Sequence, residues 1–352
     1  MEANRFDKRL EQISSAIWSK ITQVDELKGQ WAGGSNLAPQ ILGRLKKSVL
    51  VTSTGSSTRI EGAHLSDEAV EKLMRGLSVQ KFSDRDTQEV RGYYELLENV
   101  FGSFETINFS EGSVKHLHKE LLKYVEKDKL HRGEYKKTEN KVEMINEAGE
   151  SAGVLFDTSP AYLTPKEMQE LLEWAQNALN EKKHHPLLII GNFIVEFLMI
   201  HPFQDGNGRL SRILTNLLLL KCGYLFIPYV SHEKLIEDNK PDYYLSLRKS
   251  QKTFKLEKED ITEWLKFFLN VLQMQATAAI ELLKKQNIES MLSAKQLAVY
   301  KFLETKEEAT PAQISAGTNV ARPTVNQVLS KLLGYEKIVK IGIGRATRYR
   351  KL

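Results

Sequence analysis

HPFQDGNGRLSR, residues 201–212, joins two strongly apolar stretches and decides how the rest of the chain is interpreted. The stretch before it, LLIIGNFIVEFLMI (187–200), and the stretch after it, RLSRILTNLLLLKCG (209–223), both have the composition of buried helices. Pro202 should end the first helix near His201, because the residue before a proline disfavours helical dihedral angles. We therefore expect a short turn between two central helices.

The turn has the residues of an anion-binding site. Gly206 and Gly208 permit positive φ angles and close backbone approach, so the N–H groups of DGNG would face outward at a helix N-terminus. Arg209 and Arg212 lie three positions apart on one helix face, and their guanidinium groups suit phosphate oxygens. Asp205 beside two arginines makes sense as a carboxylate that holds Mg²⁺ on a phosphate.

His201 stands at the entrance of the turn, with an imidazole that can accept a proton near pH 7. A base, a metal-binding carboxylate and a phosphate site together predict phosphoryl or nucleotidyl transfer. Two alternatives stay open. One is a glycine-rich connection between helices with surface arginines, and the other is a zinc site through His201 and Asp205, for which the turn offers neither a cysteine nor a second histidine.

Helical periodicity through most of the chain predicts a mainly α protein. Two short β-capable runs about EAGESAG (147–153) predict a hairpin at 142–156, and TGSSTRIEGAHLSDEAVEKLMRG (54–76) predicts a Gly/Ser turn and helical pieces. The single cysteine excludes a disulfide framework, and the charged N-terminus lacks the apolar segment of a signal peptide, so we expect a cytoplasmic protein. The 14 apolar residues 187–200 are too few to span a bilayer and include Glu196, so no membrane partner is expected.

HPFQDGNGRLSR matches, position by position, the Fic family signature HPFxDGNGRxxR, and weaker similarity covers about residues 110 to 272. The chain resembles this family, whose members move AMP from ATP to a Tyr, Thr or Ser hydroxyl of a target protein and release pyrophosphate. The resemblance implies that His201 is the general base, that Asp205 holds Mg²⁺, and that the hairpin is a flap that clamps a target segment by strand addition. The nucleotide-binding positions that it implies are Asp205, Gly206, Asn207, Gly208, Arg209, Arg212, Tyr243, Tyr244, Gln251, Met144, Ile145, Asn146 and Glu147.

SSTRIEG, residues 56–62, resembles the inhibitory motif [S/T]xxxE[G/N] of the same family, with Ser57, Glu61 and Gly62 at the specified positions. An ion pair between Glu61 and Arg212 would occupy the arginine needed for the γ-phosphate and add negative charge where phosphate must sit. The resemblance thus implies autoinhibition, and it also allows Glu61 to orient water for the removal of AMP.

Residues 288–352 have the order helix, helix–turn–helix and basic hairpin that is typical of a winged-helix module. Residues 292–352 carry 11 Lys or Arg against 4 Asp or Glu, so the net charge is +7 there and −2 in the remainder of a chain with +5 overall. This charge favours DNA as a partner of the module, while protein docking or a homodimer stays open. The residues expected to contact DNA are Arg322, Thr324, Asn326, Gln327, Arg345 and Arg348.

The sequence therefore predicts a helical region 1–109 with the inhibitory motif, a Fic-type catalytic core 110–272 with a small β-hairpin flap, and a winged-helix domain 288–352. The expected function is protein adenylylation with ATP and Mg²⁺. A DNA-binding transcriptional regulator whose Fic-like domain senses nucleotide with little chemistry is the alternative. Transfer of UMP from UTP also stays open, because the turn binds phosphates and not the base.

Overall fold

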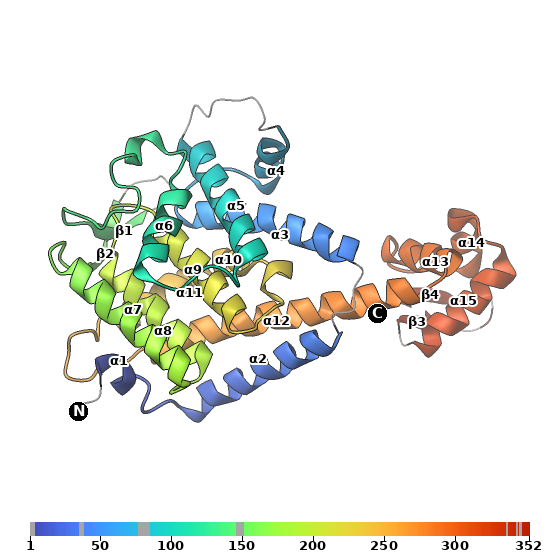
Figure 1. Ribbon diagram of the computed structural model, residues 1–352. Coiled ribbons are helices and arrows are strands. Elements are labelled where there is room, and N and C mark those ends of the chain that lie inside the picture. The colour runs from blue at the N-terminus through green and yellow to red at the C-terminus, as the bar shows by residue number, and fades with distance from the viewer. Residues whose placement is uncertain are drawn as a thin grey trace. The chain divides into compact units, whose positions relative to one another are not determined.

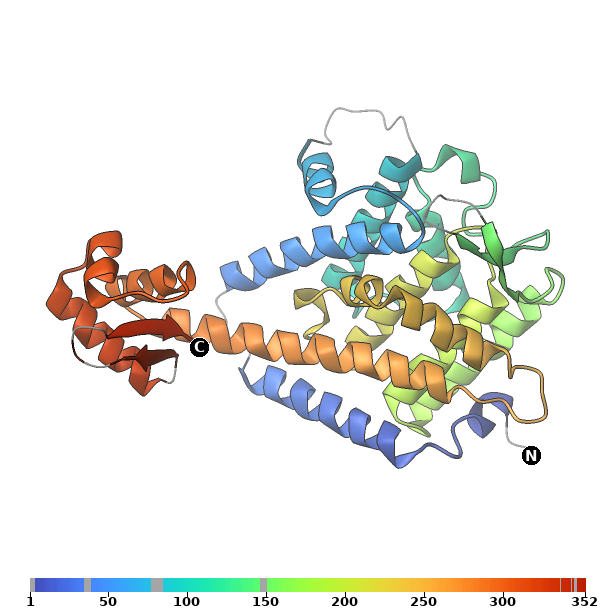
Figure 2. The same cartoon turned by 180° about the vertical axis from the view of Figure 1, so that it is seen from behind.

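The computed structural model describes residues 4–34, 39–76, 85–145, 151–335, 337–342, 344 and 347–352. The chain divides into two compact units, Met1–Ile280 and Glu281–Leu352. The first unit contains α1 (Arg5–Lys8), α2 (Ser15–Gly34), α3 (Pro39–Ile60), α4 (Asp67–Gly76), α5 (Arg85–Ser103), α6 (Glu111–Leu121), η1 (Glu126–Asp128), β1 (Lys141–Ile145), β2 (Ser151–Asp157), α7 (Thr164–Glu181), α8 (Pro186–Ile200), α9 (Asn207–Lys221), η2 (Ile227–Tyr229), α10 (His232–Asp238), α11 (Lys240–Gln251) and most of α12 (Thr262–Met291). The mainly α fold class with a small antiparallel hairpin is confirmed (Figures 1 and 2).

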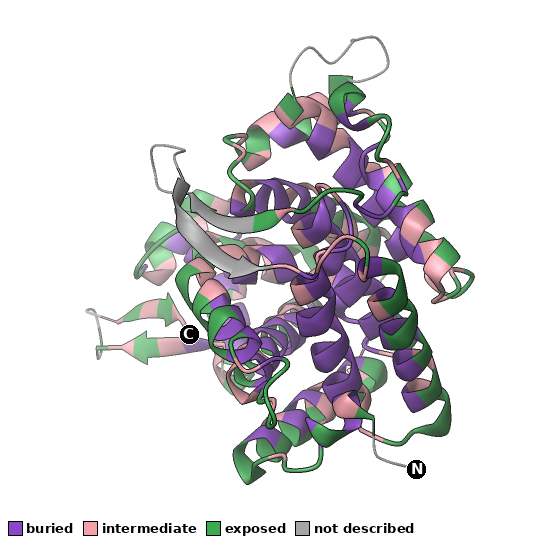
Figure 3. Cartoon of the chain, turned by 90° about the vertical axis from the view of Figure 1, so that its left-hand side faces the viewer, coloured by how far each residue is buried: buried purple, intermediate pink, exposed green. Residues whose placement is uncertain are grey.

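The helices α8 and α9 are buried along nearly their whole length. Figure 3 shows buried residues gathered in the inner helices of the unit, with exposed residues on the outward faces. α8 begins at Pro186, where a missing N–H is harmless, and it packs against α7 and α9. Its polar partners come from the N-terminal segment and from Gln251 and Trp264. None of the described helices is long and apolar enough to cross a membrane.

Glu196 is the charged residue inside the apolar α8, and two arginines from the start of the chain neutralise it. The Glu196 carboxylate lies 2.7 Å from Arg9 Nη2 and 2.6 Å from Arg5 Nη2. The Arg9 side chain is 0% exposed and the Glu196 side chain 3% exposed. Because an unpaired buried charge costs several kcal/mol, this ion pair anchors α1 and the residues after it to the central helix.

The helix α3 corrects the Gly/Ser turn predicted within residues 54–76, since it runs without a break from Pro39 to Ile60 and includes Gly55, Ser56 and Ser57. α3 packs against α5, α9 and α10, and small buried side chains allow these helices to approach closely. The Thr58 hydroxyl donates to the backbone oxygen of Thr54 at 3.0 Å, and the hydroxyls of Ser53 and Ser231 are 2.8 Å apart. Turn-forming residues are therefore helical here because tertiary packing and local hydrogen bonds satisfy them.

The strands β1 and β2 form the predicted hairpin at 142–156. Their antiparallel pairing runs from Lys141 opposite Asp157 to Ile145 opposite Ser151, with two register shifts between these ends. Register shifts of this kind bend a strand locally. The hairpin is joined to the rest of the unit close to the turn that follows α8, because the backbone N–H of Ser159 donates to an α8 carbonyl at 3.3 Å.

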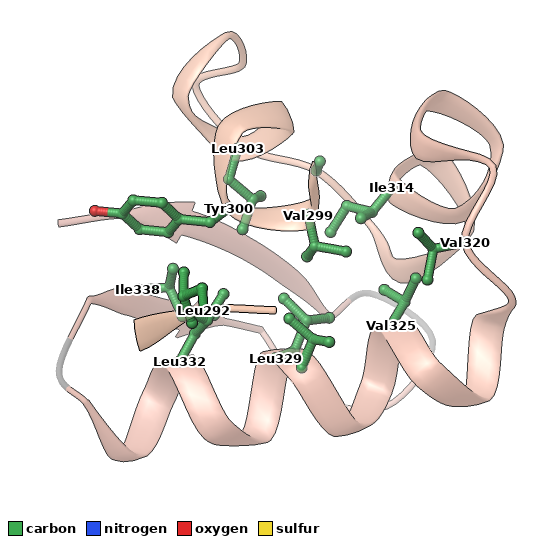
Figure 4. Close-up of a cluster of buried hydrophobic side chains, with 12 residues drawn as sticks. Leu292, Val299, Tyr300, Leu303, Ile314, Val320, Val325, Leu329, Leu332 and Ile338 are labelled. Atoms are coloured by element: carbon green, nitrogen blue, oxygen red, sulfur yellow. The ribbon is translucent and has the colours of Figure 1, made fainter. Parts of the chain in front are cut away.

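The second unit contains α13 (Ala294–Glu304), α14 (Pro311–Thr318), α15 (Arg322–Gly334), β3 (Ile338–Ile341) and β4 (Arg348–Lys351). β3 and β4 pair antiparallel, and a bridge between Ala309 and Tyr349 places a third extended segment beside β4. Its core takes side chains from all three helices and β3, as Figure 4 shows. Three helices and a hairpin follow the order expected from the sequence, and the winged-helix assignment itself stays a prediction.

Replacement of Gly92 tests the close packing of α5 on α6. A Cβ atom at Gly92 would lie 2.1 Å from the backbone oxygen of Leu121, so Gly92→Ala must push two helices apart. We expect a loss of about 1–3 kcal/mol in the free energy of unfolding, measured by urea unfolding with circular dichroism. Gly102→Ala, in open space on the same helix, is the control and should be neutral or stabilise by up to about 1 kcal/mol. Equal losses in the two variants would contradict the packing described.

Candidate active site

The turn between α8 and α9 has an unusual backbone. His201 follows the last residue of α8 with a φ of 52°, and Gly206 precedes α9 with a φ of 79°. A left-handed conformation costs a non-glycine residue roughly 1–2 kcal/mol, so the contacts around His201 must hold it there.

Side chains from inside and outside the turn provide these contacts. Asn207 Oδ1 accepts from the N–H of Phe203 at 2.9 Å, and Asn207 Nδ2 donates to the oxygen of Phe203 at 2.7 Å. Lys136 Nζ donates to the last carbonyl of α8 at 3.0 Å, and Asn140 Nδ2 donates to Phe203 at 2.8 Å. The Asn207 side chain therefore shapes the turn, and a phosphate-binding role stays a prediction for its backbone N–H.

The N-terminus of α9 offers hydrogen-bond donors. Gly206 has no side chain to cap the helix, and the helical hydrogen bonds begin with the N–H of Leu210, which donates to the oxygen of Gly206 at 2.9 Å. The N–H groups of Asn207, Gly208 and Arg209 precede that bond. Such groups, together with the helix dipole, form an anion site.

His201 is a neutral imidazole. Burial lowers the pKa of His201 to about 4, and the positive charge of Lys136 acts in the same direction. His201 Nδ1 lies 3.3 Å from the oxygen of Leu198. Because a carbonyl oxygen only accepts, the proton is assigned to Nδ1, and Nε2 keeps the lone pair that a general base needs.

Asp205 lies between two arginines. Its Oδ2 accepts from Arg85 Nη2 at 2.6 Å and from Arg209 Nη2 at 3.2 Å, while its Oδ1 accepts from the N–H of Gly206 at 2.7 Å. Glu89 lies 2.7 Å from each arginine. Burial alone would raise the pKa of Asp205, but the charge of Arg209 and the Gly206 hydrogen bond outweigh it and lower the pKa.

Arg212 is almost fully buried and is held by the segment that contains the inhibitory motif. Its Nε donates to Ser57 Oγ and its Nη2 to the Ser57 backbone oxygen, both at 2.9 Å. The predicted ion pair with Glu61 is present, at 2.7 Å between Nη2 and Oε1. Burial alone lowers the pKa of Arg212, and the attraction of Glu61 outweighs this and raises it.

Two glycines permit this contact. A Cβ atom at Gly208 would lie 2.2 Å from Glu61 Oε1, so a larger residue there would displace the carboxylate from its present position at the start of α9. Gly62 has a φ of 99°, which lets the chain turn away directly after Glu61.

His118, on α6, packs against the turn between α8 and α9. The sequence did not identify it as a site residue. Its ring stacks on Phe203 with 3.8 Å between centroids. His118 Nδ1 accepts from the N–H of Gly133 at 2.9 Å, so Nε2 donates to the backbone oxygen of Asp205, also at 2.9 Å. Burial lowers the pKa of His118 to about 4, which fits this neutral tautomer.

The residues predicted on the adenine side lie on or at the end of α11. Tyr243 is 3% exposed and packs edge-on against Trp264 with 5.9 Å between centroids, and the half-buried Tyr244 lies with its hydroxyl 3.5 Å from the oxygen of Ile60. Gln251 Nε2 donates to a backbone oxygen of α8 at 3.2 Å. All three therefore take part in packing, and their nucleotide role stays a prediction.

Four further positions were predicted on the nucleotide side of the hairpin. Met144 and Ile145 lie in β1, whereas Asn146 and Glu147 lie outside the described residues. The described part of the chain has no group of three or more His, Cys, Asp or Glu side chains that could hold a metal, so a zinc site at His201 lacks further protein ligands there.

Comparison with known proteins identifies the family that the residues around this turn match. The sequence model of the Fic/DOC family matches residues 108–219, a range that includes α6, the hairpin, the turn and most of α9. Residues 108–219 form a Fic/DOC domain. The resemblance inferred from twelve residues thus extends over a domain.

Named relatives of the Fic domain are protein adenylyltransferases. A probable protein adenylyltransferase of Aquifex aeolicus is 29% identical over 122 residues, which cover 34% of this chain and 37% of that protein. The protein adenylyltransferase Fic of Drosophila melanogaster is 27% identical over 185 residues, covering 52% of this chain and 35% of that protein. These matches span well under half the length of the relatives.

Solved structures share the fold over a longer range. A Fic family protein from Desulfovibrio desulfuricans superposes with a TM-score of 0.64 and 24% identity, covering 97% of both chains. A Fic domain containing signaling protein from Bacteroides thetaiotaomicron gives a TM-score of 0.59 and 22% identity, covering 75% of this chain and 97% of that chain.

The Fic domain should lose stability in acid through His118 and His201. Their pKa values of about 4 in the folded chain lie below the ordinary value of 6.5, so the unfolded chain binds protons that the folded chain does not. Stability is then fully present above about pH 6.5 and is lost progressively toward pH 4. Urea midpoints measured at about pH 7, 6 and 5 should fall, and less steeply in a His118→Phe variant. An unchanged slope in that variant would show that His118 binds its proton normally.

Proposed function

We propose that the chain is a protein adenylyltransferase that moves AMP from ATP to a Tyr, Thr or Ser hydroxyl of a target protein. The observation that carries this proposal is the turn 201–212, where a neutral His201 with an available Nε2 stands beside an uncapped helix N-terminus and two buried arginines. The names of the relatives that match the Fic domain support the same activity.

In the proposed reaction His201 Nε2 takes the proton of the incoming hydroxyl. The hydroxyl oxygen forms a bond to the α-phosphorus of ATP, and the bond from that phosphorus to the bridging oxygen of pyrophosphate breaks. The N–H groups at the start of α9 hold the phosphates, and Arg209 and Arg212 bind their β and γ end. The products are the adenylylated target protein and pyrophosphate, which is the leaving group.

Asp205 would hold Mg²⁺, and the bound ion would neutralise negative charge on the phosphates. Its Oδ2 suits this role because it accepts only from guanidinium groups of Arg85 and Arg209, and a divalent cation and its phosphates can replace such partners. Since Mg²⁺ commonly binds through one or two carboxylates plus phosphates, a single carboxylate at the turn fits. Arg85 and Arg209 would then be available to the phosphate oxygens.

Glu61 acts in this proposal as an intrinsic inhibitor. Its carboxylate lies on Arg212 and against Gly208, where the γ-phosphate would be bound, so it removes a phosphate partner and adds a like charge. The same carboxylate could orient a water molecule to remove AMP, and that activity is a further part of the proposal.

Incubation of the full chain with Mg²⁺ and α-labelled ATP tests the proposal. Glu61→Gly should increase the label on protein by about tenfold or more, because Arg212 becomes available to the phosphates. A tenfold change corresponds to about 1.4 kcal/mol in activation free energy. His201→Ala in that background should reduce it by about 10²–10⁴, the usual contribution of a general base.

The control is Glu71→Gly, which removes an exposed carboxylate paired with Arg75 and should leave labelling unchanged. Absence of label in every variant would favour the alternative, a nucleotide-sensing regulator with little chemistry. A stronger signal from α-labelled UTP than from ATP would instead identify UMP as the transferred group.

We also propose that the second unit binds DNA. The buried residues of α15 recur at helical spacing, and the opposite face exposes Arg322, Asn326 and Gln327, while Thr324 is half-buried. Arg348 is exposed on β4 and pairs with Glu308, and Arg345 lies outside the described residues. A polar, basic helix face with a net charge of +7 in its unit suits phosphates and base edges.

Gel retardation with the full chain and duplex DNA tests this second proposal. Retardation should weaken steeply as salt rises, because bound phosphates release counterions. Arg322→Ala should weaken binding by about 1–3 kcal/mol, whereas Arg75→Ala, an exposed arginine of the first unit, should have no effect. No retardation at low salt would favour protein docking or a homodimer.

A further inference from the structure

A chain of buried hydrogen bonds leads from Arg212 away from the turn. Arg212 Nε donates to Ser57 Oγ at 2.9 Å, and an interaction of the Ser57 side chain with the Tyr93 hydroxyl acts to lower the pKa of Tyr93, against the larger effect of burial, which raises it. Tyr93 donates in turn to Glu233 Oε1 at 2.9 Å. Ser57, Tyr93 and Glu233 are each 0% exposed, so water does not compete for these bonds. We call these three side chains the Glu233 relay.

The direction of the donors is fixed along the Glu233 relay. A guanidinium Nε–H only donates, and a carboxylate only accepts. Between them, the Ser57 hydroxyl accepts from Arg212, and the Tyr93 hydroxyl donates to Glu233. Both bonds point from the cation toward the anion, and the lowering effect of Ser57 on the pKa of Tyr93 fits a Ser57 hydroxyl that is directed toward Tyr93.

Glu233 cannot leave its position as Glu61 can. Its Oε1 also accepts from Asn216 Nδ2 at 2.6 Å, and it lies within α10, which packs on α3. The Glu61 side chain is 34% exposed and lies just after the last residue of α3. One carboxylate is therefore a permanent, indirect partner of Arg212, and the other is a direct and removable one.

Charge balance gives the Glu233 relay its role. When Glu61 withdraws before phosphate arrives, a buried guanidinium group loses its direct anion, and an unbalanced buried charge costs several kcal/mol. The Ser57 contacts hold only the Nε and Nη2 groups of Arg212, and Nη1 makes no hydrogen bond among the described residues. Tyr243 also contacts the Arg212 guanidinium group, so the donors that neither Ser57 nor Tyr243 covers are the ones left for a ligand.

We propose that Ser57, Tyr93 and Glu233 are positioning residues that keep Arg212 in place to bind the β and γ phosphates of ATP once Glu61 has withdrawn. The proposal rests on the nucleotide-binding role of the turn given above. It extends the role of Ser57, because one residue of the inhibitory motif would serve the active state as well.

The test compares two nucleotides, because AMP lacks the phosphates that Arg212 would bind. In a Glu61→Gly background, the dissociation constants of ATP and AMP are measured by calorimetry for Ser57→Ala, Tyr93→Phe and Glu233→Gln. Each variant should bind ATP about tenfold more weakly and AMP within about twofold of its parent, which is a change of 1.4 kcal/mol confined to ATP. The KM for ATP should rise by a similar factor, and kcat should fall by a smaller factor.

Two reference variants separate the possible failures. Arg212→Ala should weaken ATP binding at least as much as the three variants do, and an unchanged ATP affinity there would contradict the proposed function of the turn. Tyr124→Phe removes a hydroxyl that donates to Glu95, which lies on α5 as Tyr93 does. This variant should change the affinity for neither nucleotide.

If Arg212→Ala weakens ATP binding while the three relay variants leave the ratio of ATP to AMP affinity unchanged, the relay proposal is overturned. An equal loss of ATP and AMP would also overturn it, because that result indicates a general loss of structure. Thermal unfolding of each variant identifies any that does not fold, and the conclusion is then drawn from the remaining ones.

Discussion

The guanidinium group of Arg212, buried where α9 meets α3, is the constraint on which the site depends. A cation that is removed from water must have an anion or strong acceptors beside it, and the end of α3 supplies both through Ser57 and Glu61. The close packing of a helix rich in serine, threonine and glycine follows from that requirement. Bulkier side chains at these positions would hold α3 too far from α9 for its backbone to reach the arginine.

A second requirement is the left-handed backbone at His201. The apolar residues of α8 fill the centre of the unit, and the left-handed conformation of His201 ends that helix abruptly. Lys136, Asn140 and Asn207 hold the carbonyl groups that this exit would leave without partners. His201 and the N-terminus of α9 are thus held by hydrogen bonds from Asn207 and from Lys136 and Asn140, which lie in the loop between η1 and β1.

The sequence alone predicted the turn, its helices, the hairpin and the pair Glu61–Arg212, because each has a local signal or a dense motif. It did not predict Arg85, Glu89 or His118, which reach the turn from α5 and α6. Arg85 and Asp205 are 120 positions apart and His118 and Asp205 are 87 apart, and nothing in KHLHKE or RDTQEV marks these side chains as partners of the turn. The Gly/Ser turn predicted within residues 54–76 was wrong for a related reason: turn propensity is local, whereas the helix at Gly55, Ser56 and Ser57 is stabilised by the helices that pack on it.

Ser57 lies inside α3, while Glu61 follows the last helical residue, Ile60, and is itself followed by a glycine with positive φ. The two residues that bind Arg212, Ser57 and Glu61, therefore differ in backbone freedom. Because Glu61 lies beyond the last helical residue, its carboxylate can move away while the final turn of α3 stays intact and Ser57 stays bound. The contact between Glu61 and Arg212 can in this way open and close by a small local motion, which any molecule that binds the exposed residues after Gly62 could bias.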